Sequence, residues 1–390
     1  MNCILMPWTP DLPALLHTLP MRRELCIDGK VCNCGVDGKH LAGLQGADIH
    51  TNTRDKHRNT TSDPDNGRHG GASPPRSIRE LEKPFDMFDA DHGFKLATFK
   101  TNTDEDRVGI VRENSIWPLQ EVLKFQSGST PLQVNDMVSV IRNWDLIKDS
   151  IHAEGEGIDL SDVKLQAPIP RPTGTIMCIG KNYLDHVKEV DTWKTDPGIT
   201  QPEAPKHPIV FTKAPQSVVG PGAAIVYPHG WSDRVDYEAE LAVIIGKAGR
   251  GISKEDALKH VFGYTIINDV TAREVQKRHQ QWFLGKSCDT FCPMGPWIVP
   301  ASQLDGQNLA LQCWINDELR QNGRTSQMIF SIAELIETIS VGITLQPGDI
   351  LATGTPSGVG SGFNPPRHLK PGDKICIKIE GIGELHNHVE

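Results

Sequence analysis

The sequence VDYEAELAVII (235–245), followed shortly by YTIINDVTARE (264–274), is the stretch around which this chain is organised. Acidic residues at every second position lead into an unbroken apolar run, and this pattern predicts a strand that enters a core. Side chains two apart on a strand share a face, so Glu238 and Glu240 are expected to point the same way. Asp269 ends the second apolar run and is expected at the rim of the same sheet.

Neighbouring carboxylates repel one another unless a proton or a cation lies between them. Hard oxygen ligands suit Mg²⁺ or Ca²⁺ better than zinc, which makes Glu238, Glu240 and Asp269 candidate metal ligands. Taken alone, the Glu-x-Glu pattern favours an exposed strand face that carries acids. Asp269 would then belong only to a helix cap, because Thr271 and Glu274 have capping-box spacing. The wider sequence decides between these interpretations.

Six sequence blocks, in this order along the chain, resemble the fumarylacetoacetate hydrolase superfamily. They are IMCIGKNYLDHVKE (176–189), PIVFTKAPQSVVGPG (208–222), DYEAELAVIIGK (236–247), GYTIINDVTAREVQ (263–276), WFLGKSCDTFCPMGPWIV (282–299) and LATGTPSGVG (351–360). Within the family, GKSCDTFCPMGP and the tail PPRHLKPGDKICIKIEGIGEL look most like the branch called fumarylacetoacetate hydrolase domain-containing protein 2. The resemblance implies a strand-rich α+β fold with a mixed β-roll. It also implies a divalent metal, Mg²⁺ or alternatively Mn²⁺ or Ca²⁺, held by Glu238, Glu240 and Asp269.

Three further side chains are candidates for the chemistry. In KNYLDHVKEV (181–190) a short helix is expected, and spacing of three places His186 and Glu189 on one face. On spacing alone this is an ordinary surface pair, whereas the resemblance implies a general-base dyad whose carboxylate orients the imidazole. Lys286 lies among apolar neighbours, either as a snorkelling side chain or as a placed cation. The resemblance implies that it contacts the substrate oxyanion.

The segment DILATGTPSGVG (349–360) is expected to form a strand and a glycine-rich turn. Backbone N–H groups in such a turn form an anion nest suited to a substrate carboxylate. Because no βαβ unit surrounds it, a dinucleotide site is rejected. The polar segment 191–207 is expected to act as a lid. The candidate substrate-binding residues are Lys181, Tyr183, Gln276, Gly354 and Thr355.

We expect three parts in the chain. Residues 1–92 are predicted to be a low-complexity, disordered extension, since their middle is too polar to bury a core. Residues 93–168 are predicted to form a small N-terminal α+β domain, and residues 169–390 the catalytic domain. Helices are expected from Ser253 and over 331–340, and hairpins at LQCWINDELRQ (311–321) and LKPGDKICIKIEGIGEL (369–385).

Composition excludes several function classes. The 390 residues carry a net charge of −9 and no basic block interleaved with aromatics, which argues against nucleic acid as a partner. No apolar run approaches the ~18 residues of a membrane span. Nine scattered cysteines favour a reducing compartment, so cytoplasm or mitochondrion is expected rather than secretion. The resemblance implies a homodimer.

The combined features predict an enzyme that acts on a small 2-oxo acid. A divalent cation would stabilise an enolate, and His186 would remove a C3 proton or activate a water. This arrangement supports keto–enol tautomerisation, C–C bond hydrolysis or decarboxylation. The resemblance favours an oxaloacetate tautomerase, then an acylpyruvate- or fumarylacetoacetate-type hydrolase or an oxaloacetate decarboxylase. A catalytically silent, metal-stabilised binding protein is the alternative from another class.

Overall fold

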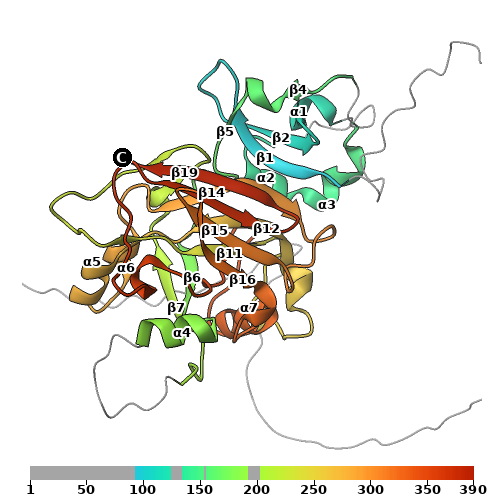
Figure 1. Ribbon diagram of the computed structural model, residues 1–390. Helices are drawn as coiled ribbons and strands as arrows, with labels where there is room; N and C mark the ends of the chain where they lie inside the picture. Colours follow the sequence, from blue (N-terminus) through green and yellow to red (C-terminus); the bar gives the residue numbers. More distant parts are fainter. Residues whose placement is uncertain (1–92, 124–133, 153–154, 192–202) are drawn as a thin grey trace, which may run out of the picture. The chain divides into compact units, whose positions relative to one another are not determined.

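The computed structural model describes residues 93–123, 134–152, 155–191 and 203–390 (Figure 1). All of them belong to one compact unit, residues 76–390. The predictions for residues 1–92 and for most of the expected lid lie outside these ranges.

A long, mixed sheet of twelve strands forms the centre of the unit. Its main path runs, in spatial order, through β4 (Ile158–Asp159), β3 (Ser115–Pro118), β2 (Arg107–Arg112), β1 (Lys95–Lys100), β14 (Cys292–Pro300), β12 (Val261–Asn268), β11 (Ala239–Ile245), β17 (Ile350–Ala352), β6 (Ile176–Gly180) and β7 (Ile209–Lys213). Two short strands join from the side, β5 (Lys164–Leu165) on β1 and β8 (Val218–Val219) on β14. The β17–β6 and β14–β8 pairs are parallel, and the other pairs of this sheet are antiparallel.

A second sheet of five strands consists of β16 (Glu318–Arg324), β15 (Ala310–Ile315), β18 (Lys374–Ile379), β19 (Gly383–Val389) and β9 (Ala224–Ile225). Both hairpins expected here are confirmed. Asn316 and Asp317 turn the first one with φ of 50° and 67°, as the favoured two-residue hairpin turn requires. A two-stranded ribbon pairs β10 (Val235–Asp236) with β13 (Thr271–Ala272).

Strand β11 is buried along its whole length because both faces of the sheet are covered. Leu241 and Val243 pack in a core shared with the five-stranded sheet and helix α7 (Ile332–Ser340). Ala242 and Ile244 face a second core, to which the helix α2 (Met137–Arg142) contributes. A strand buried on both faces reads as a continuous apolar run, which explains LAVII. The expected strand-rich α+β fold is confirmed.

The remaining helices are short. They are α1 (Leu119–Val122), α3 (Trp144–Ile147), α4 (Leu184–Asp191), α5 (Arg273–Arg278) and α6 (Phe283–Lys286), with 3₁₀ turns η1 (Lys148–Ser150), η2 (Leu160–Asp162), η3 (Pro215–Ser217), η4 (Ala257–His260), η5 (Thr325–Gln327) and η6 (Gly360–Gly362). The expected helix from Ser253 is wrong, since only turns and η4 form there. The segment has two adjacent apolar residues, of which Ala257 is buried and Leu258 is exposed. It therefore lacks the apolar stripe that stabilises a longer helix.

The expected capping box at Thr271 and Glu274 is also wrong. Helix α5 begins at Arg273, after Thr271 has already paired within β13. The Thr271 hydroxyl donates to the carbonyl of Asp269, while Glu274 accepts from Ser232. The acid therefore ties α5 to the preceding loop instead of capping the helix.

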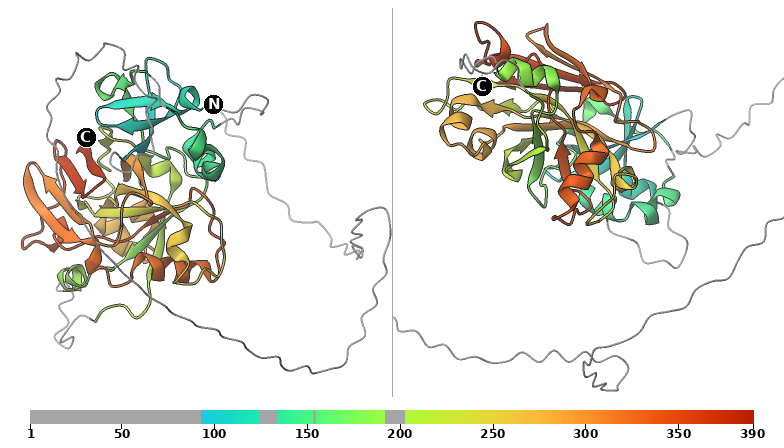
Figure 2. Two further views of the ribbon diagram at one scale, coloured as in Figure 1. Left: turned by 90° about the vertical axis from the view of Figure 1, so that its right-hand side faces the viewer. Right: turned by 90° about the horizontal axis from the view of Figure 1, so that it is seen from below.

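The segment expected as an N-terminal domain is joined directly to the rest. Strand β1 pairs with β14 through Leu96 and Ile298, and Leu96 shares one core with Ile176 and Ile350. Figures 1 and 2 show strands β1 and β2 and helix α4 at opposite ends of the long sheet. The division at residue 168 remains a prediction. No helix among the described residues has the length and apolarity to cross a membrane, and the cysteines in the described ranges are all free.

Helix α7 gives a pH-dependent test of the fold. Ser331 and Glu334 form a capping box, and Lys254 Nζ lies 2.8 Å from Glu334 Oε1. The bonds from Lys254 and Ser331 lower the pKa of Glu334 to about 2. Its stabilising contribution is therefore complete above about pH 4.5 and disappears as the pH falls through about 2.

We expect Glu334→Gln to reduce the free energy of unfolding by about 0.5–1 kcal/mol at neutral pH, and by progressively less below about pH 4.5. Urea unfolding across this pH range measures the difference. The matched control is Glu255→Gln, which removes one exposed acid from the neighbouring turn. A difference that stays constant as the pH falls would contradict the assignment.

Candidate active site

Strand pairing brings the three candidate metal ligands together. Ala239 lies opposite Asn268 in the β11–β12 pair, and the Asp269 N–H donates to the Glu238 carbonyl at 2.8 Å. One oxygen each of Glu238, Glu240 and Asp269 can be chosen so that all lie within 4.8 Å of one another. The three residues are 5%, 1% and 0% exposed. The alternative of a solvated acidic strand face is therefore contradicted.

Three buried cations surround these acids. The Lys286 ammonium bridges Glu238 Oε2 at 2.8 Å and Asp269 Oδ2 at 2.7 Å. Lys213, at the end of β7, donates to Asp269 Oδ1 at 2.7 Å and to the Lys286 carbonyl. Arg273 contacts Glu238 Oε1 at 2.7 Å and Asp236 Oδ2 at 2.9 Å. Every ion in the cluster thus has an opposite charge or a hydrogen bond, as burial demands.

The cluster has an excess of one negative charge, since four carboxylates, including Asp236, face three cations. Burial alone would raise the pKa of Glu238, but Lys286 and Arg273 outweigh it and lower that pKa. The excess negative charge is least compensated at Glu240. Burial strongly raises the pKa of this residue, and the negative charges of Asp269 and Glu238 raise it further. A further cation beside Glu240 would remove this electrostatic cost.

The donor set fits a hard divalent cation. Three carboxylates supply oxygen ligands and no sulfur or imidazole, which is the chemistry that Mg²⁺, Mn²⁺ and Ca²⁺ prefer. Glu238 and Asp269 already bind Lys286, yet a carboxylate offers about four lone-pair positions and can bind two cations. Glu238, Glu240 and Asp269 are therefore the residues that could hold a metal.

The His186–Glu189 pair faces the same place from helix α4. His186 is buried, and its Nδ1 lies 3.3 Å from Glu189 Oε2. The Glu189 carboxylate in turn accepts from the Gly358 N–H, at 2.9 Å to Oε1 and 3.1 Å to Oε2. A carboxylate acceptor favours the tautomer with its proton on Nδ1, which leaves Nε2 as the basic atom. His186 is thus buried and oriented by a partly buried Glu189, as the family resemblance implies and unlike the ordinary surface pair that spacing alone favours.

The glycine-rich turn binds anions, but these anions belong to the protein. The Gly354 N–H donates to Glu240 Oε2 at 2.9 Å, the Gly358 N–H to Glu189, and the Gly360 N–H to Asp236 Oδ1 at 2.7 Å. Gly354 has φ of +97°, and a Cβ there would lie 2.8 Å from the Asn182 Cβ. The turn therefore positions carboxylates of the candidate site, where the sequence predicts a nest for a substrate carboxylate.

A small enclosed cavity of about 70 Å³ lies at the centre of this arrangement. Seven of the eleven residues predicted from the sequence line it, namely Lys181, His186, Glu238, Glu240, Gln276, Lys286 and Thr355. Larger hollows exist, such as one of about 830 Å³ beside Phe94 and Trp144, but the buried ionisable groups converge on the small one. Its size suits a small molecule, since pockets for larger ligands span about 300–1,000 Å³.

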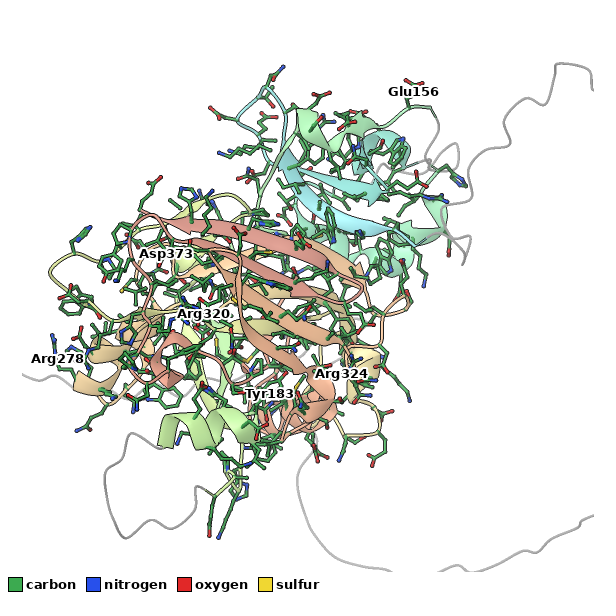
Figure 3. The ribbon with its side chains drawn as sticks, in the orientation of Figure 1. Glu156, Tyr183, Arg278, Arg320, Arg324 and Asp373 are labelled. Atoms are coloured by element: carbon green, nitrogen blue, oxygen red, sulfur yellow. The ribbon has the colours of Figure 1, made fainter. Side chains whose placement is uncertain are left out.

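The other four predicted residues lie behind this lining. Asp269, Glu189 and Gly354 contact Lys286, His186 and Glu240 respectively. Tyr183 directly precedes α4 (Figure 3) and is buried. Among the tyrosines of the described ranges, its hydroxyl is the only one that is buried without a hydrogen-bond partner.

Thr355 lines the cavity, but its hydroxyl already donates to the Ala239 carbonyl at 2.9 Å and accepts from Gln321. Both hydrogen bonds are structural, and its contact with substrate stays a prediction.

A family model described as "Fumarylacetoacetate (FAA) hydrolase C-terminal" matches residues 175–390. The chain belongs to the fumarylacetoacetate hydrolase family. Over 231 residues it is 55% identical to oxaloacetate tautomerase YisK of Bacillus subtilis (strain 168), covering 59% of this chain and 74% of that protein.

Solved structures agree with this family assignment. A fumarylacetoacetate hydrolase from the psychrophilic Exiguobacterium antarcticum is 38% identical with a TM-score of 0.63, over 76% of this chain and 99% of that one. A maleylpyruvate hydrolase from Sphingobium sp. SYK-6, solved with manganese(II) and pyruvate, is 33% identical with a TM-score of 0.59, over 76% and 98%. The protein is thus an enzyme of the fumarylacetoacetate hydrolase superfamily, while the finer branch within it remains a prediction.

Sequence reasoning missed three members of the site, Asp236, Lys213 and Arg273. Asp236 is fully buried, and Arg273 together with the Ser361 N–H lowers its pKa against the opposing effect of burial. Arg273 Nη2 is buried and among the described groups has no hydrogen-bond partner, although the residue lines the cavity. All three residues lie within the blocks that carry the family resemblance. Because Glu238, Glu240 and Asp269 form a surplus of acids, cations are to be expected in the same blocks.

The different partners of Glu240 and Asp269 predict different effects of neutralising them. In EDTA, Glu240→Gln is expected to change the free energy of unfolding by less than about 1 kcal/mol, because the amide oxygen can still accept from Gly354. Asp269→Asn leaves Lys213 and Lys286 poorly compensated and is expected to cost about 3–5 kcal/mol. Urea unfolding of both variants measures these values.

The Glu240→Gln variant also tests metal binding. Glu240→Gln is expected to weaken Mn²⁺ binding by at least about tenfold, measured by electron paramagnetic resonance of free Mn²⁺. Unchanged Mn²⁺ affinity in a folded Glu240→Gln protein would show that Glu240 is not a ligand.

Proposed function

We propose that this protein is a divalent-metal-dependent oxaloacetate keto–enol tautomerase. The observation that carries the proposal is that His186, Lys286, Glu238 and Glu240 line a single small cavity, with Asp269 directly behind Lys286. The identity of 55% to an oxaloacetate tautomerase supports the substrate.

Glu238, Glu240 and Asp269 would hold the metal, and we propose Mg²⁺ because all three donors are hard oxygens. When bound, this ion supplies Lewis-acid polarisation of the keto oxygen of a 2-oxo acid. The charges of the site match such a ligand. A divalent cation turns the excess of one negative charge into one positive charge, which the C1 carboxylate of the substrate then neutralises.

The chain's own residues account for the proton movements. Conversion of enol to keto oxaloacetate removes a proton from the enol oxygen and adds one at C3. His186 Nε2 is suited to hold this proton between the two events, since Glu189 fixes the ring through Nδ1. Lys286 keeps positive charge beside the oxygen that gains negative charge. The unpaired Arg273 Nη2 and the Gln276 amide are candidates to bind the second carboxylate of a dicarboxylic substrate.

A second candidate reaction is hydrolytic C–C bond cleavage of an acylpyruvate. The 33% identity to a maleylpyruvate hydrolase, whose structure contains manganese(II) and pyruvate, favours it. The same His186 would then activate a water in place of moving a C3 proton. Oxaloacetate decarboxylation would need no base. Unlike tautomerisation and hydrolysis, it would therefore not depend on His186. The homodimer implied by the family resemblance also remains a prediction.

The deciding experiment follows the ultraviolet absorbance of freshly dissolved enol-oxaloacetate with purified protein and Mg²⁺. We expect enol decay to accelerate without release of pyruvate, and EDTA or Glu240→Gln to abolish the acceleration. Pyruvate released in step with enol decay would replace this assignment with decarboxylase. If enol decay is not accelerated, oxaloacetate tautomerisation is excluded, and acylpyruvates would be tested next.

The roles of His186 and Glu189 can be separated. His186→Ala is expected to lower kcat for tautomerisation by about 10²–10⁴-fold, the usual contribution of a general acid–base group. Glu189→Gln is expected to lower it less, by about tenfold, because the amide oxygen can still orient the imidazole. Mn²⁺ affinity serves as the control and should be unchanged in both. Equal activity of His186→Ala and the wild type would remove His186 from the mechanism.

A further inference from the structure

A second group of metal-ligating side chains lies on the five-stranded sheet, apart from the three acids. It consists of Cys376 on β18 and Glu384 and His386 on β19. One ligand atom from each lies within 4.8 Å of the others. Cys376 Sγ is 3.8 Å from His386 Nε2, and the same Nε2 is 3.0 Å from Glu384 Oε2. We name these three residues the Cys-His-Glu cluster.

The register of the hairpin creates this cluster. Cys376 pairs with His386 across the two strands, and Glu384 follows two residues from His386 on the same face. Ile375, Ile377 and Leu385 point to the opposite face and are buried in the core. The cluster therefore faces away from the core, and His386 and Glu384 are exposed. It opens on a hollow of about 610 Å³ that dissolved ions can enter.

The geometry indicates a ligand site and not a nucleophilic relay. In a Cys-His-acid relay the thiol and the carboxylate contact opposite nitrogens of the imidazole. Here Cys376 and Glu384 both approach Nε2, so all three ligand atoms converge on one point.

The distances are close to those of tetrahedral coordination. With Zn–S of about 2.3 Å and Zn–N and Zn–O of about 2.0–2.1 Å, tetrahedral angles place S and N about 3.6 Å apart and N and O about 3.4 Å apart. The observed separations of 3.8 Å and 3.0 Å lie on either side of these values. Small side-chain rotations on an exposed face are sufficient to reach them.

We propose that the Cys-His-Glu cluster binds a borderline transition-metal ion of the Zn²⁺ class, with water completing the coordination. Lys378 supports the site, since its ammonium holds Glu384 Oε1 at 3.0 Å and leaves Oε2 directed at His386. Thiolate and imidazole select Zn²⁺ or Co²⁺ over Mg²⁺, whereas the all-oxygen site at Glu240 has the opposite preference. The enzyme thus has two metal sites of different hardness.

Cobalt titration of the full chain tests the proposal, with saturating Mg²⁺ present to occupy the oxygen site. A cobalt–thiolate bond gives a charge-transfer band in the near ultraviolet, which oxygen ligands alone do not give. We expect one equivalent of Co²⁺ to produce this band and Zn²⁺ to abolish it. A background with Cys26, Cys32 and Cys34 replaced by serine removes the thiols that cluster near the start of the sequence.

Cys376→Ser is expected to abolish the band, and His386→Ala to weaken Co²⁺ binding by at least about tenfold. Cys288→Ser, which removes another partly buried free thiol, is the matched control and should leave the band unchanged. A band that survives Cys376→Ser, or no band in the starting protein, would overturn the proposal.

Thermal unfolding gives an independent readout that also reports folding of the variants. Zn²⁺ should raise the Tm of the wild type and of Cys288→Ser, because a ligand that binds the native state stabilises it. The Tm of Cys376→Ser and of His386→Ala should not respond to Zn²⁺. Since His386 is exposed, its replacement leaves the core intact. An equal Zn²⁺ response in all four proteins would place the metal elsewhere.

Discussion

The Lys286 ammonium, held between Glu238 and Asp269, is the interaction on which the rest of the site depends. Each partner is almost completely buried, so none of the three charges can rely on water. Lys213 joins the same arrangement by binding Asp269 and the Lys286 carbonyl. Removing one member leaves an uncompensated charge in the core, which couples the integrity of the site to that of the fold.

The two sheets explain how so many charges come to be buried together. Strand β11 has cores on both faces, so Glu240 at its beginning has no path to solvent along the sheet. The turn after β17 then covers this strand end and directs N–H groups at the acids, with Gly354 on Glu240 and Gly360 on Asp236. Backbone dipoles compensate part of the charge without adding a further cation. The excess of negative charge remains least compensated at Glu240, where a further cation would remove its electrostatic cost.

Sequence reasoning recovered the parts of this arrangement that are local in the chain. Periodicity and turn residues located β11, the two hairpins of the five-stranded sheet and α7, because each is specified by a few consecutive residues. The counter-charges Lys213 and Arg273 could not be found in this way, since Lys213 meets Asp269 from 56 positions away. The role of the glycine-rich turn was also hidden, because an anion nest in the sequence does not say whether its anion is a substrate or a side chain such as Glu189. The helix predicted from Ser253 shows the opposite case. Its residues favour a helix locally, but the helix does not form because the segment has no apolar face to bury.

Burial distinguishes the two proposed metal sites of the molecule. At Glu240, desolvation makes an unpaired carboxylate costly, so a bound cation stabilises the surrounding core as well as any substrate that it contacts. On the outer face of β18 and β19, His386 and Glu384 remain hydrated, and a metal there would exchange with solvent without disturbing the buried ions. In the hairpin, strand alternation directs Ile375 and Ile377 inward and Cys376 outward, whereas Glu240 lies on β11, which is buried on both faces. Whether a cluster of ligands is tied to the fold or can exchange its ion therefore depends on whether the strand face that carries it is buried or exposed.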